Sequence, residues 1–227
     1  MQSHFIFLVL AAATIMVTSC GTPSEKEQPK KEQTKASEIA GNAQKGKSLY
    51  TTCAACHGQN AEGMAALNAP ALADQEPYYL KMQLNNFRTN KRGSHEKDIF
   101  GAQMQPMAKV LNSEGIADVI AYIKTLTPSK PEATIEGDIA NGQNYYNMIC
   151  GACHGPGATG IESLHSPKLI GMQDWYLERQ LNNFRDSIRG TAEGDVFGAQ
   201  MQQIAASIPD DQTVKDIVAY LNSLQEE

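Results

Sequence analysis

The sequence predicts an all-α protein built from two tandem copies of one helical domain. The chain has 227 residues, 41% of them hydrophobic, which is enough for two domains of about 100 residues each. Its second half repeats the first at an offset of 97 residues. Apolar residues recur at helical spacing in both halves, and no alternating strand pattern of useful length appears.

Short identical phrases carry the repeat. FGAQMQ occurs at 100–105 and 197–202, QLNNFR at 83–88 and 180–185, and CAACHG at 53–58 returns as CGACHG at 150–155. One extra residue precedes Cys150, and another lies between Met201 and the last predicted helix. Pro128 and Pro131 interrupt the chain between the copies. We therefore place the first domain at 42–128 and the second at 134–227.

Each copy ends in a predicted amphipathic helix. The apolar positions are Ile116, Val119, Ile120, Ile123 and Leu126, matched by Val214, Ile217, Val218, Leu221 and Leu224. Ser113 and Asp211 are the predicted N-cap residues. A middle helix is predicted from Leu80, Leu84 and Phe87, matched by Leu177, Leu181 and Phe184.

The first 41 residues are predicted to lie outside the fold. Phe5–Val17 is an apolar run suited to a signal peptide, and Val17–Cys20 resembles the lipobox of bacterial lipoproteins, which predicts a signal at 1–20 and a lipid on Cys20. The alternative is an ordinary cleaved signal with an incidental Cys20, because Met1–His4 carries no Lys or Arg. Residues 21–41 are rich in Glu, Lys, Gln and Pro, so we expect a disordered tether with a typical span of ~25 Å.

Four of the five cysteines lie in two Cys-x-x-Cys-His motifs, the pattern of c-type haem attachment. The motifs comprise Cys53, Cys56 and His57, and Cys150, Cys153 and His154. In this chemistry the thiols bind the haem covalently and the histidine ligates the iron. The alternatives are a shared zinc site and a redox disulfide. A histidine after both pairs favours two covalently bound haem c groups, since a zinc site would be shared between the copies and a thioredoxin-like fold needs strands.

Met104 and Met201 are the predicted sixth ligands. Of the nine methionines, only these two align with each other under the 97-residue offset. A thioether opposite the histidine raises the reduction potential of a haem. His95 and His165 fail the same test, because they align with Ala192 and Asn68. The alternative is a pair of methionines that fill gaps in the core.

From about residue 42 to its end, the chain resembles two fused class I cytochrome c domains of the di-haem cytochrome c4 type. The resemblance rests on the two haem motifs, on Pro70 and Pro167, on the two Gln-Leu-x-x-Phe-Arg-x-x-x-Arg segments and on the two methionines. It implies an electron carrier in which each proline carbonyl accepts the Nδ1 proton of a ligand histidine. The four repeated arginines are Arg88, Arg92, Arg185 and Arg189.

Each arginine pair is spaced by four residues, which predicts one shared helix face. The arginines could neutralise haem propionates or meet across the domain interface. The alternative is an ordinary solvated face.

The predicted function is a non-enzymatic electron carrier, exported from a bacterial cytoplasm and held on the periplasmic side by its lipid. Its expected partners are redox proteins of a respiratory chain, such as a dehydrogenase or a terminal oxidase. The alternative is a haem-bearing subunit of a dehydrogenase or peroxidase complex. No nucleotide-binding loop or catalytic triad pattern is visible.

The distribution of charge adds a prediction about partners. The net charge of -6 argues against nucleic-acid binding. Residues 42–128 carry nine Lys/Arg and seven Asp/Glu, a net +2, whereas residues 134–227 carry five and thirteen, a net -8. This difference predicts that separate partners dock on the two domains, with Glu193 and Asp195 among the steering acids near the second haem. The alternative is drift of exposed charges.

Overall fold

The computed structural model describes residues 41–225, and within this range it contains helices and no β-strand. The all-α prediction is thereby confirmed. The predicted signal peptide and, apart from Gly41, the predicted tether lie outside the described residues. The first copy contains α1 (Ala43–His57), a 3-10 turn (Ala65–Leu67), α2 (Pro77–Arg88), α3 (Ile99–Lys109) and α4 (Ser113–Ile123). The second contains α5 (Ile139–Tyr145), a π-helical turn (Tyr146–Cys150), α6 (Gly151–His154), a 3-10 turn (Glu162–Leu164), α7 (Asp174–Arg185), α8 (Val196–Ala205) and α9 (Asp211–Ser223).

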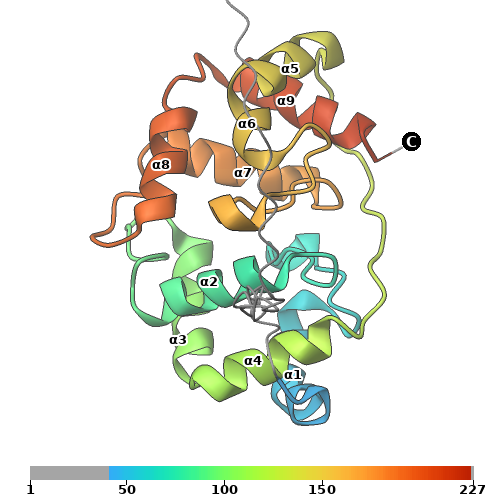
Figure 1. Ribbon diagram of the computed structural model, residues 1–227, viewed down its shortest axis with the longest axis vertical. Helices are drawn as coiled ribbons and strands as arrows, with labels where there is room; N and C mark the ends of the chain where they lie inside the picture. Colours follow the sequence, from blue (N-terminus) through green and yellow to red (C-terminus); the bar gives the residue numbers. More distant parts are fainter. Residues whose placement is uncertain (1–40, 226–227) are drawn as a thin grey trace, which may run out of the picture. The chain divides into compact units, whose positions relative to one another are not determined.

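The first and last helices of each copy cross in close contact. α1 packs on α4, and α5 packs on α9 in the same way (Figure 1). Gly46 and Gly142 lie at the two crossings. A Cβ on either glycine would stand 1.9 Å from the main-chain oxygen of Asp118 or Asp216. Both positions are therefore glycine because the opposing backbone leaves no room for a side chain.

The apolar residues predicted for the last helices form the two cores. Ile116, Val119, Ile120 and Ile123 are buried in the first copy, and Val214, Ile217, Val218 and Leu221 in the second. The predicted N-caps were wrong by one residue. Asn112 Oδ1 accepts from Gly115 N at 2.7 Å, and Asp210 Oδ1 accepts from Thr213 N at 2.8 Å. These extended residues direct their oxygens at the free N–H groups, so Ser113 and Asp211 begin the helices instead.

The extra residue before Cys150 is accommodated by the π-helical turn. Tyr50 and Tyr146 hold equivalent places, because their hydroxyls donate to the carbonyls of Gly58 at 2.9 Å and Gly155 at 2.6 Å. The two copies therefore match in structure at these tyrosines and also at the cysteines that follow, although the second copy has one more residue between them. The added residue widens the single turn between them, as insertions in helices commonly do.

Candidate functional site

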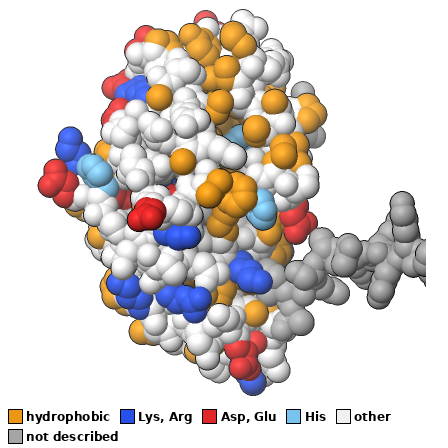
Figure 2. All heavy atoms as spheres, turned by 60° about the vertical axis from the view of Figure 1, so that its left-hand side comes forward, with side chains coloured by type: hydrophobic (Ala, Val, Ile, Leu, Met, Phe, Trp, Pro, Cys, Tyr) orange, Lys and Arg blue, Asp and Glu red, His pale blue; other side chains and the backbone are white. Residues whose placement is uncertain are grey.

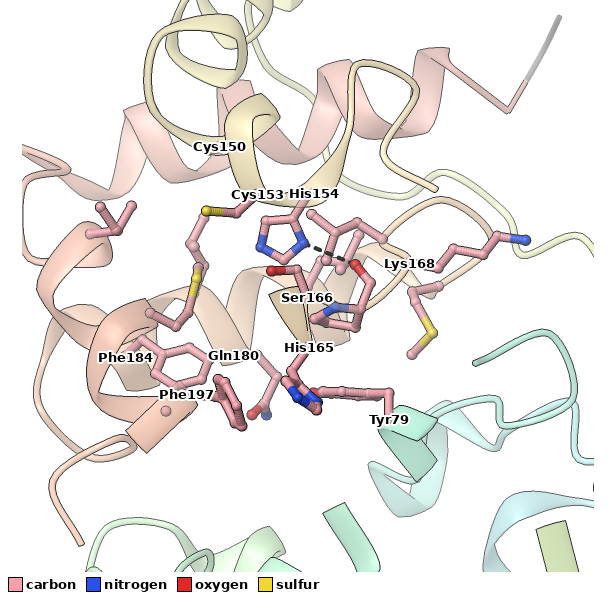
Figure 3. A pocket seen from close by; sticks show the side chains of 18 of the residues that line it. Tyr79, Cys150, Cys153, His154, His165, Ser166, Lys168, Gln180, Phe184 and Phe197 are labelled. Atoms are coloured by element: carbon pink, nitrogen blue, oxygen red, sulfur yellow. Dashed lines mark hydrogen bonds between the residues drawn. The ribbon is translucent and has the colours of Figure 1, made fainter. Parts of the chain in front are cut away.

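The histidine of each motif is buried and has a fixed orientation. His57 is 5% exposed and His154 is 6% exposed. The Nδ1 atom of His57 lies 2.7 Å from the Pro70 oxygen, and that of His154 lies 2.9 Å from the Pro167 oxygen (Figure 3). A carbonyl can only accept, so Nδ1 carries the proton and Nε2 keeps its lone pair for a metal. Burial lowers the pKa of both imidazoles, despite the opposing effect of the proline carbonyls, and this favours the neutral, ligating form.

The four cysteines of the motifs, all within the described residues, are not paired with one another. Cys53 is half-buried, Cys150 is buried, and Cys56 and Cys153 are exposed. Burial raises the pKa of the Cys53 thiol and raises that of Cys150 to about 12. Redox-active cysteines need a lowered pKa, because the thiolate is the nucleophile. Burial therefore gives the Cys53 and Cys150 thiols no reactive-thiolate character.

A cavity in the second copy brings its predicted site residues together. It is lined by Cys150, Cys153, His154, Pro167 and Met201 (Figure 3). Much of its remaining wall is apolar and includes Leu169, Leu177, Leu181, Phe184, Ile217 and Leu221. The first copy also contributes to this wall through Tyr79, Met82 and Gln83. In the first copy, Met104 lies half-buried on α3 as Met201 lies on α8.

The four arginines do not share helix faces as predicted. α2 ends at Arg88 and α7 ends at Arg185, so Arg92 and Arg189 lie in the following loops. Asn90 and Ser187 adopt the left-handed conformation and turn the chain away from the helix axis.

The hydrogen bonds and ion pairs of Arg88 and Arg185 stay within their own copy. Arg88 donates to Asn85 Oδ1 at 2.8 Å, and Arg185 pairs with Asp211 and Asp186. Of these four arginines, Arg92 and Arg189 are the two that hydrogen-bond to the other copy.

Arg92 and Arg189 meet across the contact between the copies. Arg92 donates to Gln83 Oε1 at 2.8 Å and to Gln180 Oε1 at 3.0 Å. Arg189 donates to the same two oxygens at 2.8 Å each. The hydroxyls of Tyr176 and Tyr79 complete the network as acceptors for Arg92 at 2.9 Å and Arg189 at 3.2 Å.

Sequence reasoning did not single out these glutamines or tyrosines as site residues. The signal was present, because both polar glutamines recur within the identical QLNNFR phrases. Only the folded chain shows that the two phrases face each other.

These donors fit a haem in each copy. Arg92 and Arg189 are each 7% exposed, and their Nε atoms are buried without a hydrogen-bond partner. Their hydrogen-bond acceptors are uncharged amide and phenol oxygens. Two buried positive charges with uncharged acceptors are stabilised when an anion binds beside them. Haem propionates would supply carboxylates, while the cysteines would hold the haem and the histidine Nε2 atoms would hold its iron.

A family model described as cytochrome c matches residues 43–127 and again residues 139–225. The chain belongs to the cytochrome c family. The cytochrome carries two covalently bound haem c groups, which decides against the zinc and redox-disulfide alternatives.

Relatives indicate the subgroup. Cytochrome c4 of Pseudomonas aeruginosa is 31% identical over 193 residues, covering 82% of this chain and 89% of that protein. A thiosulfate dehydrogenase electron acceptor of Stutzerimonas stutzeri is 31% identical over 170 residues, covering 70% and 73%. The crystal structure of reduced recombinant cytochrome c4 from Pseudomonas stutzeri aligns with a TM-score of 0.62 and 27% identity, covering 81% of this chain and 98% of that one. The cytochrome is thus an electron-carrying, cytochrome c4-type di-haem protein with redox partners.

The surface changes one charge prediction. Asp195 is 6% exposed, because its carboxylate caps α8 by accepting from Gly198 N at 3.1 Å and also accepts from Asn86 of the first copy at 3.3 Å. Reversing its charge would disrupt the cap and the contact with Asn86, so of the two predicted steering acids only Glu193 is an exposed surface residue. In Figure 2, many of the visible Lys and Arg side chains gather in the lower part, which the first copy forms.

Among residues 41–225, no helix is both long and apolar enough to cross a membrane.

Proposed function

We propose that this cytochrome is an exported electron carrier without catalytic activity of its own, working between a dehydrogenase and a terminal oxidase. The observation that carries the proposal is the complete, repeated donor set, in which each copy has its own cysteine pair, buried histidine and aligned methionine. A similar protein named as an electron acceptor of thiosulfate dehydrogenase supports a dehydrogenase as the donor.

The residues of each copy have different roles in holding a haem. When bound, the haem supplies one-electron redox chemistry. In this proposal the cysteines would fix it covalently, and the histidine Nε2 and the methionine sulfur would bind its iron. The Pro70 and Pro167 carbonyls keep each imidazole in one tautomer and one orientation. In the second copy the apolar cavity wall would keep water away from the haem.

We also propose the boundaries predicted from sequence, with domains at 42–128 and 134–227. In this arrangement residues 21–41 tether the domains to a lipid on Cys20 at the periplasmic side of a membrane. The excess of acidic residues in the second domain supports separate docking of donor and acceptor.

The methionine ligands can be tested by substitution. In Met104→His and in Met201→His, we expect one reduction potential to fall while the other stays nearly unchanged, because imidazole favours the oxidised iron more than a thioether does. The weak sulfur-to-iron charge-transfer band should lose about half its intensity in each variant. Redox titration and near-infrared absorption measure both effects. Met107→His is the control, because this exposed residue aligns with Ile204. An unchanged spectrum in both ligand variants would disprove the assignment.

The anchor has a separate test. Cys20→Ser should move the protein from the membrane fraction to the soluble exported fraction, since the tether itself offers little apolar surface for binding a bilayer. Cell fractionation with detection by haem absorbance measures the distribution. Ser19→Ala is the control and should stay with the membrane. Equal membrane retention of Cys20→Ser would show that a protein partner holds the cytochrome instead.

A further inference from the structure

The two haem sites differ in the residues at one equivalent place. An asparagine at the first site corresponds to a histidine at the second, and an arginine at the first corresponds to a methionine at the second. Under the offset of 97 residues, Asn68 matches His165, Phe100 matches Phe197, and Met82 matches Arg179. In the second copy the rings of His165 and Phe197 lie against each other, tilted by 35°, with centroids 4.1 Å apart. Both rings line the haem cavity (Figure 3). Met82 of the first copy also lines it.

The matching place in the first copy holds a positive charge. Arg179 reaches from α7 and donates to the side-chain and main-chain oxygens of Asn68, at 2.9 Å each. Its guanidinium carbon lies 4.6 Å from the centroid of the Phe100 ring. Trp175 and Tyr176 hold the same group at 5.0 and 5.6 Å from their ring centroids. These contacts fix the cation in place.

The repeat places this cation at the first haem site. His165, Phe197 and Met82 all line the cavity of the second site, so their counterparts border the first. The contacts of Arg179 agree with this placement. Asn68 lies two residues before Pro70, which orients His57, and Phe100 lies one helical turn before Met104. Arg179 therefore contacts both the segment that orients His57 and the helix that carries Met104.

We propose that the charge of Arg179 raises the reduction potential of the first haem above that of the second. A fixed cation favours the reduced haem, which carries one positive charge fewer than the oxidised haem. Among the described residues Arg179 forms no ion pair that would cancel its charge. Arg92 and Arg189 occupy equivalent places in the two copies, so their effects on the two haems are matched.

The consequence is that the single electron of the half-reduced protein resides more often on the first haem than on the second. In the half-reduced protein, the second haem loses one electron as the first gains it, and no proton or further reactant takes part. A unit charge about 12 Å from the iron, at an effective dielectric constant of about 20, would change this equilibrium about tenfold. For one electron, tenfold corresponds to ~59 mV.

The chain offers matched variants for the test. Arg179→Met gives the first site the methionine that is found at the second site. Met82→Arg gives the second site the arginine that is found at the first. We expect Arg179→Met to move the electron about tenfold toward the second haem and Met82→Arg to move it in the same direction, by raising the potential of the second haem. Arg179→Lys keeps the charge and should stay within about threefold of the parent protein.

The measurement is a redox titration followed by NMR of the half-reduced protein. Each haem is assigned by contacts of its thioether protons to Cys53 or Cys150, so the assignment does not depend on the methionine ligands. Circular dichroism and haem content show which variants fold. The proposal is overturned if Arg179→Met leaves the sharing unchanged, if both potentials shift equally, or if Arg179→Lys has the same effect as Arg179→Met. It rests on the electron-carrier function, which reversible reduction of both haems tests separately.

Discussion

Gly142→Ala is expected to destabilise the second domain by about 3 kcal/mol or more. The added Cβ would stand 1.9 Å from the Asp216 oxygen and 2.5 Å from its carbonyl carbon, both backbone atoms of α9. No side-chain rotation relieves such a clash, so α5 and α9 must move apart and loosen the core between them. Gly46→Ala should have a similar effect on the first domain, where the Asp118 oxygen also lies at 1.9 Å.

Urea unfolding followed by circular dichroism and by haem absorbance measures the loss. Gly157→Ala is the control in the second domain, because its Cβ would meet only the Thr159 methyl group at 3.8 Å. It should change the free energy of unfolding by less than about 1 kcal/mol. If Gly142→Ala were as mild as Gly157→Ala, the close crossing of α5 and α9 would not be a property of the folded protein.

The helices and the haem motifs could be predicted because their signals are local. Apolar spacing identified the α4 and α9 cores, and each Cys-x-x-Cys-His motif lies within a few residues of chain. A repeat within one sequence also identified Met104 and Met201 as the only aligned methionines. Such comparisons need no knowledge of how distant segments meet.

The positions of charged residues could not be predicted in the same way. Asp195 reads as a surface acid, yet it is buried by capping α8 and by contact with Asn86 of the other copy. Arg92 follows Arg88 by four residues, but the left-handed Asn90 ends the helical spacing between them. The difference between Met82 and Arg179 is visible in the sequence. Only the contacts of Arg179 with Asn68 and Phe100 place its charge beside the first haem site.

Asp174→Asn is expected to destabilise the second domain by about 3 kcal/mol at pH 7. Asp174 is 1% exposed and joins the segment after the Pro128–Pro131 link to α7. Its carboxylate accepts from Thr134 N, from Thr134 Oγ1 at 3.0 Å, from Ile135 N at 2.8 Å and from Trp175 N at 2.7 Å. An amide replaces one acceptor oxygen by a donor, which leaves buried N–H groups facing another N–H group. The first domain has Pro77 at this position, so the effect should be confined to the second.

The loss should depend on pH in a defined direction. Burial alone would raise the pKa of Asp174, but the bonds from Thr134, Ile135 and Trp175 outweigh it and hold the pKa below its ordinary value. The carboxylate therefore stabilises the fold fully above the unfolded pKa of about 3.9, and this stabilisation disappears as the pH falls through the lower, folded pKa. The difference in urea midpoint between the parent and Asp174→Asn should be largest near pH 7 and shrink below about pH 4. Asp186→Asn, at an exposed position, should show little difference at either pH. A gap that stayed constant down to pH 3 would mean that Asp174 acts through shape and not through its charge.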